Sequence, residues 1–155
     1  MRVGLGYDAH GLVEGRPLFL GGLRVPFEKG LLGHSDGDVL LHAISDAVLG
    51  AAGADDIGVH FPNTDKTLEG MESAGILARC VALARSRGYE IVNVDAVLVC
   101  EAPRIQPYRE EMRLSIARIM SVEVTQISIK GKTTEGMGFA GRGEGIESFA
   151  VCLLE

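Results

Sequence analysis

The first residues that could carry chemistry are an aspartate and two histidines in the N-terminal third of the chain. Asp8 and His10 lie two apart in a strand-like segment, so on an extended strand both side chains project from one face and can share an ion. His42 lies on the polar stripe of a predicted helix, with Asp38 and Asp46 one turn away on either side, and either carboxylate could orient its ring. Two imidazoles and one carboxylate leave a fourth position open on Zn²⁺, which is typical of a catalytic site. The alternatives are a polar strand end that meets solvent and a solvated histidine on a helix face.

A glycine-rich segment, residues 33–38, precedes that helix. It contains His34, and either Ser35 or Asp36 is predicted to cap the helix. Backbone N–H groups gather at such a helix start and suit a phosphate. A plain turn would explain the glycines and the serine but gives no reason for the histidine, so we favour a functional segment.

Two further loops are rich in polar groups. Residues 56–65 could recognise hydroxyl groups, although composition alone favours ordinary turn chemistry. Residues 130–135 leave a predicted strand with lysines, two threonines and a glutamate, which can meet a diphosphate and a hard cation such as Mg²⁺. The spacing is not that of a P-loop, and a polar hairpin loop with glycines at positive φ explains the same residues.

The elements that must position these residues are strands and helices in mixed order. Apolar residues at helical spacing predict helices over 36–52, over 73–87 with Gly88 as its left-handed cap, and from Pro103 to Met120. Strands are predicted over 2–8, 17–25 (as a strand or hairpin), 91–100, 126–130 and 145–154, with loops over 26–35 and 53–70. We therefore expect an α+β fold, a small sheet with helices packed on one face, whose other face is buried by oligomerisation.

Length and composition narrow the function classes. The 155 residues predict one catalytic domain, and 15 basic against 21 acidic residues argue against nucleic-acid or membrane partners. Apolar stretches are too short to span a membrane, and Met1 leads directly into the first strand, so we expect a cytoplasmic protein of bacterial type. Cys80, Cys100 and Cys152 lie in apolar surroundings and are interpreted as small core residues.

Taken in order, the segments resemble the 2-C-methyl-D-erythritol 2,4-cyclodiphosphate synthase family along the whole chain. They are Asp8-Ala9-His10, His34 to Asp38 with His42, Asp56-Ile57-Gly58 with 61–65, Thr133-Thr134-Glu135, and 138–145. The resemblance implies a homotrimer with its sheets facing the threefold axis and active sites between subunits. It also implies that 4-diphosphocytidyl-2-C-methyl-D-erythritol 2-phosphate is cyclised with release of CMP.

The resemblance also assigns roles to individual residues. Zn²⁺ would be held by Asp8, His10 and His42, and Mg²⁺ or Mn²⁺ by Glu135 together with the diphosphate, while His34 and Thr133 would be the catalytic residues that stabilise the transition state. The methylerythritol part would meet Asp56, Ile57, Gly58, Phe61, Pro62, Asn63, Thr64 and Asp65. The cytidine nucleotide would meet, on the adjoining subunit, Cys100, Glu101, Ala102, Pro103, Arg104, Ile105, Gln106, Lys132, Thr133, Thr134 and Glu135. Further substrate contacts would come from Asp8, Ala9, His10, His34, Ser35 and, near the diphosphate, Phe139 and Arg142.

Three positions depart from the family pattern. Asn63 stands where the family usually has aspartate, Ala140 where threonine is common, and Gly136 where lysine is common. Asn63 bears on hydroxyl recognition because an amide donates and accepts hydrogen bonds but carries no charge. Two other functions remain open: a phosphohydrolase that activates water with the same Zn²⁺, and a trimeric metal-binding module without catalysis.

Overall fold

The computed structural model describes residues 1–62, 64 and 71–155. Within these residues the main sheet has five strands in the order β4-β1-β7-β5-β6. Their bounds are Lys29–Leu31 (β4), Arg2–Glu14 (β1), Gly145–Leu154 (β7), Ile91–Val99 (β5) and Ile127–Lys132 (β6). Only the β5–β6 pair in this sheet is parallel. A separate hairpin consists of β2 (Leu18–Leu20) and β3 (Leu23–Val25).

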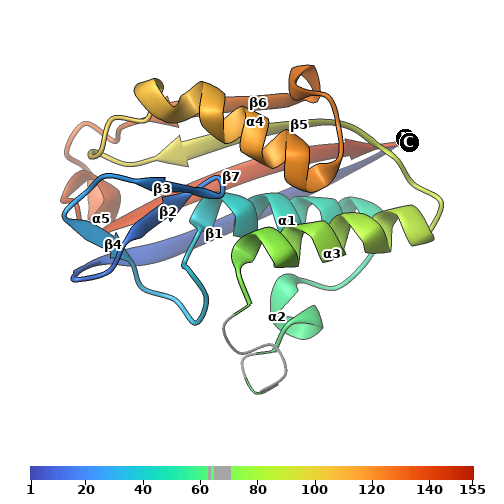
Figure 1. The fold of residues 1–155 in the computed structure, drawn as a ribbon, viewed down its shortest axis with the longest axis horizontal. Helices are drawn as coiled ribbons and strands as arrows, with labels where there is room; N and C mark the ends of the chain where they lie inside the picture. The colour runs from blue at the N-terminus through green and yellow to red at the C-terminus, as the bar shows by residue number, and fades with distance from the viewer. Residues whose placement is uncertain (63, 65–70) are drawn as a thin grey trace.

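Three long helices cover one face of the main sheet (Figure 1). They are α1 (Val39–Ala52), α3 (Ser73–Ser86) and α4 (Arg109–Met120), and the described chain adds the one-turn helices α2 (Ile57–His60) and α5 (Gly138–Gly141). Helix α1 packs on β1 and β7, α3 packs on α1, and α4 packs against β6 and α3. The predicted α+β arrangement, with helices on one face, is confirmed.

Several predicted boundaries were wrong. Strand β1 continues to Glu14 because residues 12–14 pair with β4, a short strand where a loop was predicted. Helix α4 begins at Arg109 and not at Pro103, since a 3₁₀ turn over Gln106–Tyr108 with proline in its first turn precedes it. Part of the predicted 53–70 loop forms α2, whose cap is Asp56.

The start of α1 also differs from prediction, whereas its polar stripe is present as predicted. The helix is capped by Asp38, not by Ser35 or Asp36, and the carboxylate of Asp38 accepts the N–H of Leu41 at 3.1 Å. The same carboxyl group accepts the N–H groups of Gly21 at 3.0 Å and Gly22 at 2.7 Å, so a fully buried side chain has three backbone donors, while burial raises its pKa. The stripe is buried because α3 packs over α1.

The face of the sheet away from the helices carries an exposed apolar patch on β1 and β7. Side chains on β1 and β7 alternate, and the apolar ones that point away from the helices include Val3, Leu5, Tyr7, Phe149 and Val151, which are 41–69% exposed. The hydroxyl of Tyr7 donates to Glu147 at the edge of this patch. An apolar patch on adjacent strands is typical of a surface that meets another protein chain.

The three cysteines are buried and free, as the sequence predicted. Burial raises the pKa of Cys80 and Cys152 to about 12, and that of Cys100 to about 11. They are core residues rather than nucleophiles. Among the helices of the described residues, none has the length and apolar character needed to cross a membrane.

Two glycines set how closely α1 lies on β1. A Cβ on Gly4 would collide with the carbonyl oxygen of Ala47, and one on Gly6 with that of Ala43. The strand backbone therefore lies directly against the helix backbone. This brings His42 on α1 close to Asp8 and His10, which follow the two glycines on β1.

We expect Gly6→Ala to lower the free energy of unfolding by about 3 kcal/mol or more, because backbone must move to admit the methyl group. Gly11→Ala on the same strand is the matched control, since its Cβ would meet nothing nearer than an oxygen at 3.8 Å and should cost less than about 1 kcal/mol. Urea unfolding of both variants checks this. Equal losses of unfolding free energy in the two variants would show that Gly6 is not needed for the close approach of α1 to β1.

Candidate metal centre and substrate segments

Three potential ligand atoms converge where β1 passes the first turn of α1. On β1 the side chains that face the helix continue from Gly4 and Gly6 to Asp8 and His10, which confirms that the pair shares a face. Asp8 Oδ2 lies 2.9 Å from His10 Nε2 and 3.0 Å from His42 Nδ1, and the two ring nitrogens are 3.2 Å apart. Residues far apart in the sequence thus form one cluster.

The cluster fits a small divalent cation. Ligands about 2.05 Å from a tetrahedral zinc are separated by about 3.3 Å, close to the edges of the triangle formed by these atoms. The donor set of two imidazoles and one carboxylate is also one that zinc accepts. Asp8, His10 and His42 could therefore hold a metal together.

The charges of the cluster support one another. Burial alone would raise the pKa of Asp8, but the hydrogen bonds from His10 and His42 hold it well below its usual range. The hydrogen bond to Asp8 raises the pKa of His10, against the opposing effect of burial. Asp8 and His10 thus each favour the charged form of the other.

Neither predicted carboxylate orients the ring of His42. Asp38 is committed to backbone donors around the start of α1, and Asp46 accepts the N–H of Ile57 at 2.8 Å. The ring's Nε2 instead lies 2.9 Å from the hydroxyl of Ser73, the first residue of α3. Sequence reasoning missed Ser73, although a serine at the first position of a predicted helix was a signal worth following.

The segment predicted to bind phosphate, residues 33–38, has one backbone N–H group at the helix start already engaged. At the start of α1 the N–H of Leu41 is taken by the carboxyl group of Asp38, which is buried there. His34 is exposed, and Ser35 is half-buried with its hydroxyl 3.4 Å from His42 Nε2. Arg16, another residue that sequence reasoning missed, holds this loop by donating to the carbonyls of Gly33 at 3.3 Å and Ser35 at 3.0 Å.

The segment predicted to recognise hydroxyl groups is partly described. Asp56 is exposed, and its carboxylate accepts the N–H of Val59 as the cap of α2, while Gly58 is also exposed. Phe61 and Pro62 are half-buried and Thr64 is exposed. Asn63 and Asp65 lie outside the described residues.

Two predicted nucleotide segments lie side by side in one subunit. Segments 100–106 and 132–135 follow the parallel strands β5 and β6, and the carboxylate of Glu101 accepts the N–H of Thr134 at 3.0 Å and that of Gly136 at 3.3 Å. Cys100 and Ile105, two of the predicted nucleotide contacts, are buried, so their side chains are not exposed to a ligand. Within the part of the chain that the structure describes, no hydrogen bond joins these segments to the metal cluster.

The remaining predicted substrate residues lie on the surface. Lys132, Thr133 and Glu135 are exposed, and Thr133 donates a long hydrogen bond of 3.5 Å to Glu135. Phe139 is exposed at the edge of α5. Arg142 donates to both carboxylate oxygens of Glu144, from Nε at 2.8 Å and from Nη2 at 3.0 Å.

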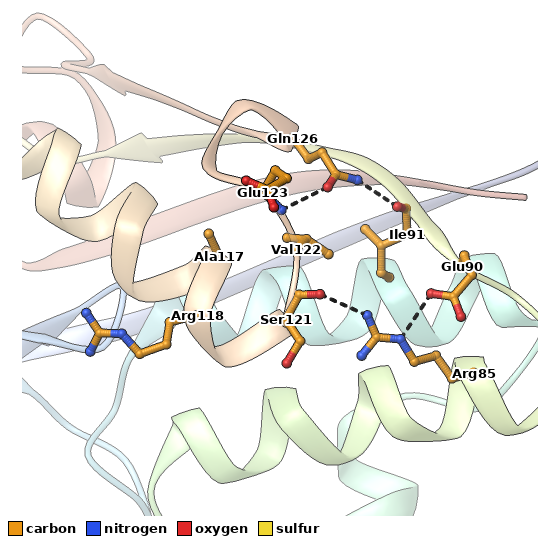
Figure 2. A pocket seen from close by; sticks show the side chains of 9 residues that line it. All are labelled: Arg85, Glu90, Ile91, Ala117, Arg118, Ser121, Val122, Glu123 and Gln126. Atoms are coloured by element: carbon orange, nitrogen blue, oxygen red, sulfur yellow. Dashed lines mark hydrogen bonds and ion pairs between the residues drawn. The ribbon is translucent and has the colours of Figure 1, made fainter.

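A pocket of about 360 Å³ lies elsewhere, at the C-terminal ends of α3 and α4 (Figure 2). Its Arg85 donates to Glu90 at 3.1 Å and to the carbonyl of Ser121 at 3.2 Å, so its charge already has partners. The lining contains none of the predicted site residues. The candidate site is therefore the open cluster at the other end of α3, and not this pocket.

We expect the affinity of the metal-free protein for zinc to rise with pH. His10 must lose its proton to bind metal, and its pKa is raised above the ordinary value near 6.5, so zinc competes with that proton. The apparent affinity should rise about tenfold per pH unit below the pKa of His10 and level off above it. Competition with a chromophoric chelator, corrected for the chelator's own protonation, measures this. An affinity that stays constant from pH 6 to 8 would contradict the assignment of His10.

Comparison with known proteins identifies the family of the chain. The YgbB family model matches residues 1–155. The 2-C-methyl-D-erythritol 2,4-cyclodiphosphate synthase of Geobacillus kaustophilus (strain HTA426) is 56% identical over 154 residues, 99% of this chain and 98% of that protein. A solved 2C-methyl-D-erythritol-2,4-cyclodiphosphate synthase, in its form with CDP bound, has a TM-score of 0.93 and 38% identity, and covers 99% of this chain and 100% of that one.

The bifunctional IspDF of Campylobacter jejuni has a TM-score of 0.95 and 37% identity. The match covers 99% of this chain and 42% of that longer protein. Full-length agreement in both sequence and fold confirms the predicted resemblance. The chain belongs to the YgbB family, and the curated relatives that it matches from end to end are 2-C-methyl-D-erythritol 2,4-cyclodiphosphate synthases.

Proposed function

We propose that this chain is a single catalytic domain that cyclises 4-diphosphocytidyl-2-C-methyl-D-erythritol 2-phosphate and releases CMP. The observation that carries the proposal is the triangle formed by Asp8, His10 and His42 in a chain of this family. The CDP in a solved relative supports a cytidine nucleotide as part of the ligand. A phosphohydrolase or a non-catalytic module has no observation of its own in its favour.

The reaction needs little acid–base chemistry from the protein. An oxygen of the 2-phosphate attacks the β-phosphorus, the bond from that phosphorus to the oxygen of the α-phosphate breaks, and CMP leaves with the electron pair. A phosphate monoester has a second pKa of about 6, so the nucleophile is already ionised near neutral pH. The difficulty is to bring one anion up to another and to hold the two in line.

The residues of the site address that repulsion. Asp8, His10 and His42 would hold Zn²⁺, and Glu135 would contribute to a Mg²⁺ or Mn²⁺ site shared with the diphosphate, since carboxylate oxygen is the ligand that such hard ions prefer. When bound, these ions supply positive charge to the phosphate oxygens. Lys132 and Arg142 would add further positive charge, and His34 and Thr133 would donate hydrogen bonds to the transition state.

We further propose a homotrimer with sites shared between subunits. The exposed apolar face of β1 and β7 provides a surface for a second copy of the chain. The nucleotide segments and the metal cluster share no hydrogen bond in the described part of one subunit, which fits a site completed across an interface. The sheets would then face the threefold axis.

Mixing two inactive variants tests the shared site. His42→Ala removes a metal ligand, and Glu101→Ala releases the segment 134–136 from the carboxylate that holds it. In a three-subunit ring, every mixed trimer has one junction with both halves intact, so random mixing at equal amounts should restore about a quarter of wild-type activity. Unfolding and refolding the two variants together, with the trimer confirmed by sedimentation, gives the measurement. Mixed trimers without activity would contradict a shared site.

The role of Glu135 is tested by Glu135→Gln, which keeps the shape and removes the charge. We expect turnover to fall by about 10²-fold or more, with zinc content and nucleotide binding retained and with partial recovery at high Mg²⁺. Glu90→Gln is the matched control, because Glu90 is exposed and its partner Arg85 lies at the far end of α3. A loss that ignores Mg²⁺ and shrinks as pH rises would instead make Glu135 a general base and favour the hydrolase.

A further inference from the structure

A buried hydroxyl connects the candidate metal ligand His42 to a carboxylate that has no role in the proposed chemistry. Ser73 is fully buried at the first position of α3, and its Oγ lies 2.9 Å from His42 Nε2. The same hydroxyl donates to Asp36 Oδ1, while the backbone N–H of Ser73 donates to Asp36 Oδ2 at 3.1 Å. Asp36 thus accepts from both groups of one residue.

The donors and acceptors are consistent with only one direction along this chain of groups. If His42 presents Nδ1 to a cation beside Asp8, the neutral ring carries its hydrogen on Nε2. That N–H donates to the oxygen of Ser73, which leaves the serine's own hydrogen for the carboxylate of Asp36, an acceptor only. Ser35 is a weaker neighbour, with its hydroxyl 3.4 Å from Nε2.

Asp36 is itself held firmly. Its Oδ1 also accepts the N–H of Asp38 at 3.0 Å, so the carboxylate is fixed by backbone on both sides of the site. At the start of α3, Glu72 makes no side-chain capping bond, and Asp36 accepts a helix N–H in its place. A carboxylate at this position is also favoured by the helix dipole.

We propose that Asp36 and Ser73 are positioning residues, which fix the ring of His42 with Nδ1 toward the metal and increase the basicity of that nitrogen. This inference rests on the metal site of the proposed function. Carboxylates that orient a ligating histidine usually contact the ring directly, and here a serine hydroxyl lies between them. Removing an orienting partner of this kind typically lowers metal affinity about 10- to 100-fold.

The test compares Ser73→Ala and Asp36→Asn with the control Ser45→Ala. Ser45 is a fully buried serine on the same helix as His42, and its hydroxyl donates at 2.7 Å to the carbonyl of Leu41 without touching the ring. Zinc affinity of each chelator-treated protein is measured by competition, and thermal unfolding of the metal-free proteins is measured in parallel. The ¹⁵N signals of the His42 ring report which nitrogen carries the hydrogen.

We expect Ser73→Ala to lower zinc affinity by about 10-fold or more and Asp36→Asn to lower it as well, since Asp36 accepts backbone N–H groups on both carboxylate oxygens and the single amide oxygen of asparagine replaces only one of them. Ser45→Ala should change zinc affinity less than about twofold, even if its melting temperature falls as much as that of Ser73→Ala. With zinc bound, the hydrogen should be on Nε2 in the wild type, and the ¹⁵N signal of Nε2 should shift in Ser73→Ala, where this N–H loses its acceptor.

Equal effects of Ser73→Ala and Ser45→Ala on zinc affinity, or none from either, would overturn the proposal. Should Ser73→Ala fail to fold, Asp36→Asn with unchanged zinc affinity and an unchanged ring signal overturns it alone. His42→Ala distinguishes a failure of the metal site from a failure of the positioning role. If that variant retains zinc, the metal site itself is wrong; if it loses zinc while the other two keep it, only the positioning role fails.

Discussion

The close contact between helix α1 and strand β1 is the constraint on which the site depends. Gly4 and Gly6 leave no side chain between the two backbones, and a Cβ at either position would overlap a helix carbonyl. Because the approach is so close, His42 on the first turns of α1 reaches Asp8 and His10 farther along the same strand. A wider spacing would separate His42 from the Asp8 and His10 pair on β1 and leave the cluster without its third ligand.

The carboxylates around this contact show how a polar site is stabilised inside an apolar core. Asp38 caps α1 and accepts backbone N–H groups of the turn between β2 and β3, Asp46 accepts the first N–H of α2, and Asp36 accepts from the start of α3. Each carboxylate fixes the end of a different element through charge-assisted hydrogen bonds. The aspartate that remains for a cation is Asp8, with imidazole nitrogens as its neighbours.

The two faces of the main sheet differ in what covers them. One face of the main sheet packs on the helices, whereas the other exposes valine, leucine, tyrosine and phenylalanine side chains on the central strands. Segments 100–106 and 132–135 meet at one end of the parallel pair β5 and β6 and form a continuous surface held by Glu101. In the proposed trimer, assembly through the apolar face would bring the metal cluster of one subunit to the polar loop surface of another.

The sequence by itself determined the local features. Period-two and helical patterns predicted the long strands and helices, and the i, i+2 spacing placed Asp8 and His10 on one face, because these features depend on residues close together in the chain. Tertiary structure decided the rest. Strand β4 has no pattern of its own and exists through pairing with the end of β1, and the polar stripe of α1 is buried because α3 covers it. The partner of His42 is Ser73, 31 residues away, since only packing brings the start of α3 to the metal cluster.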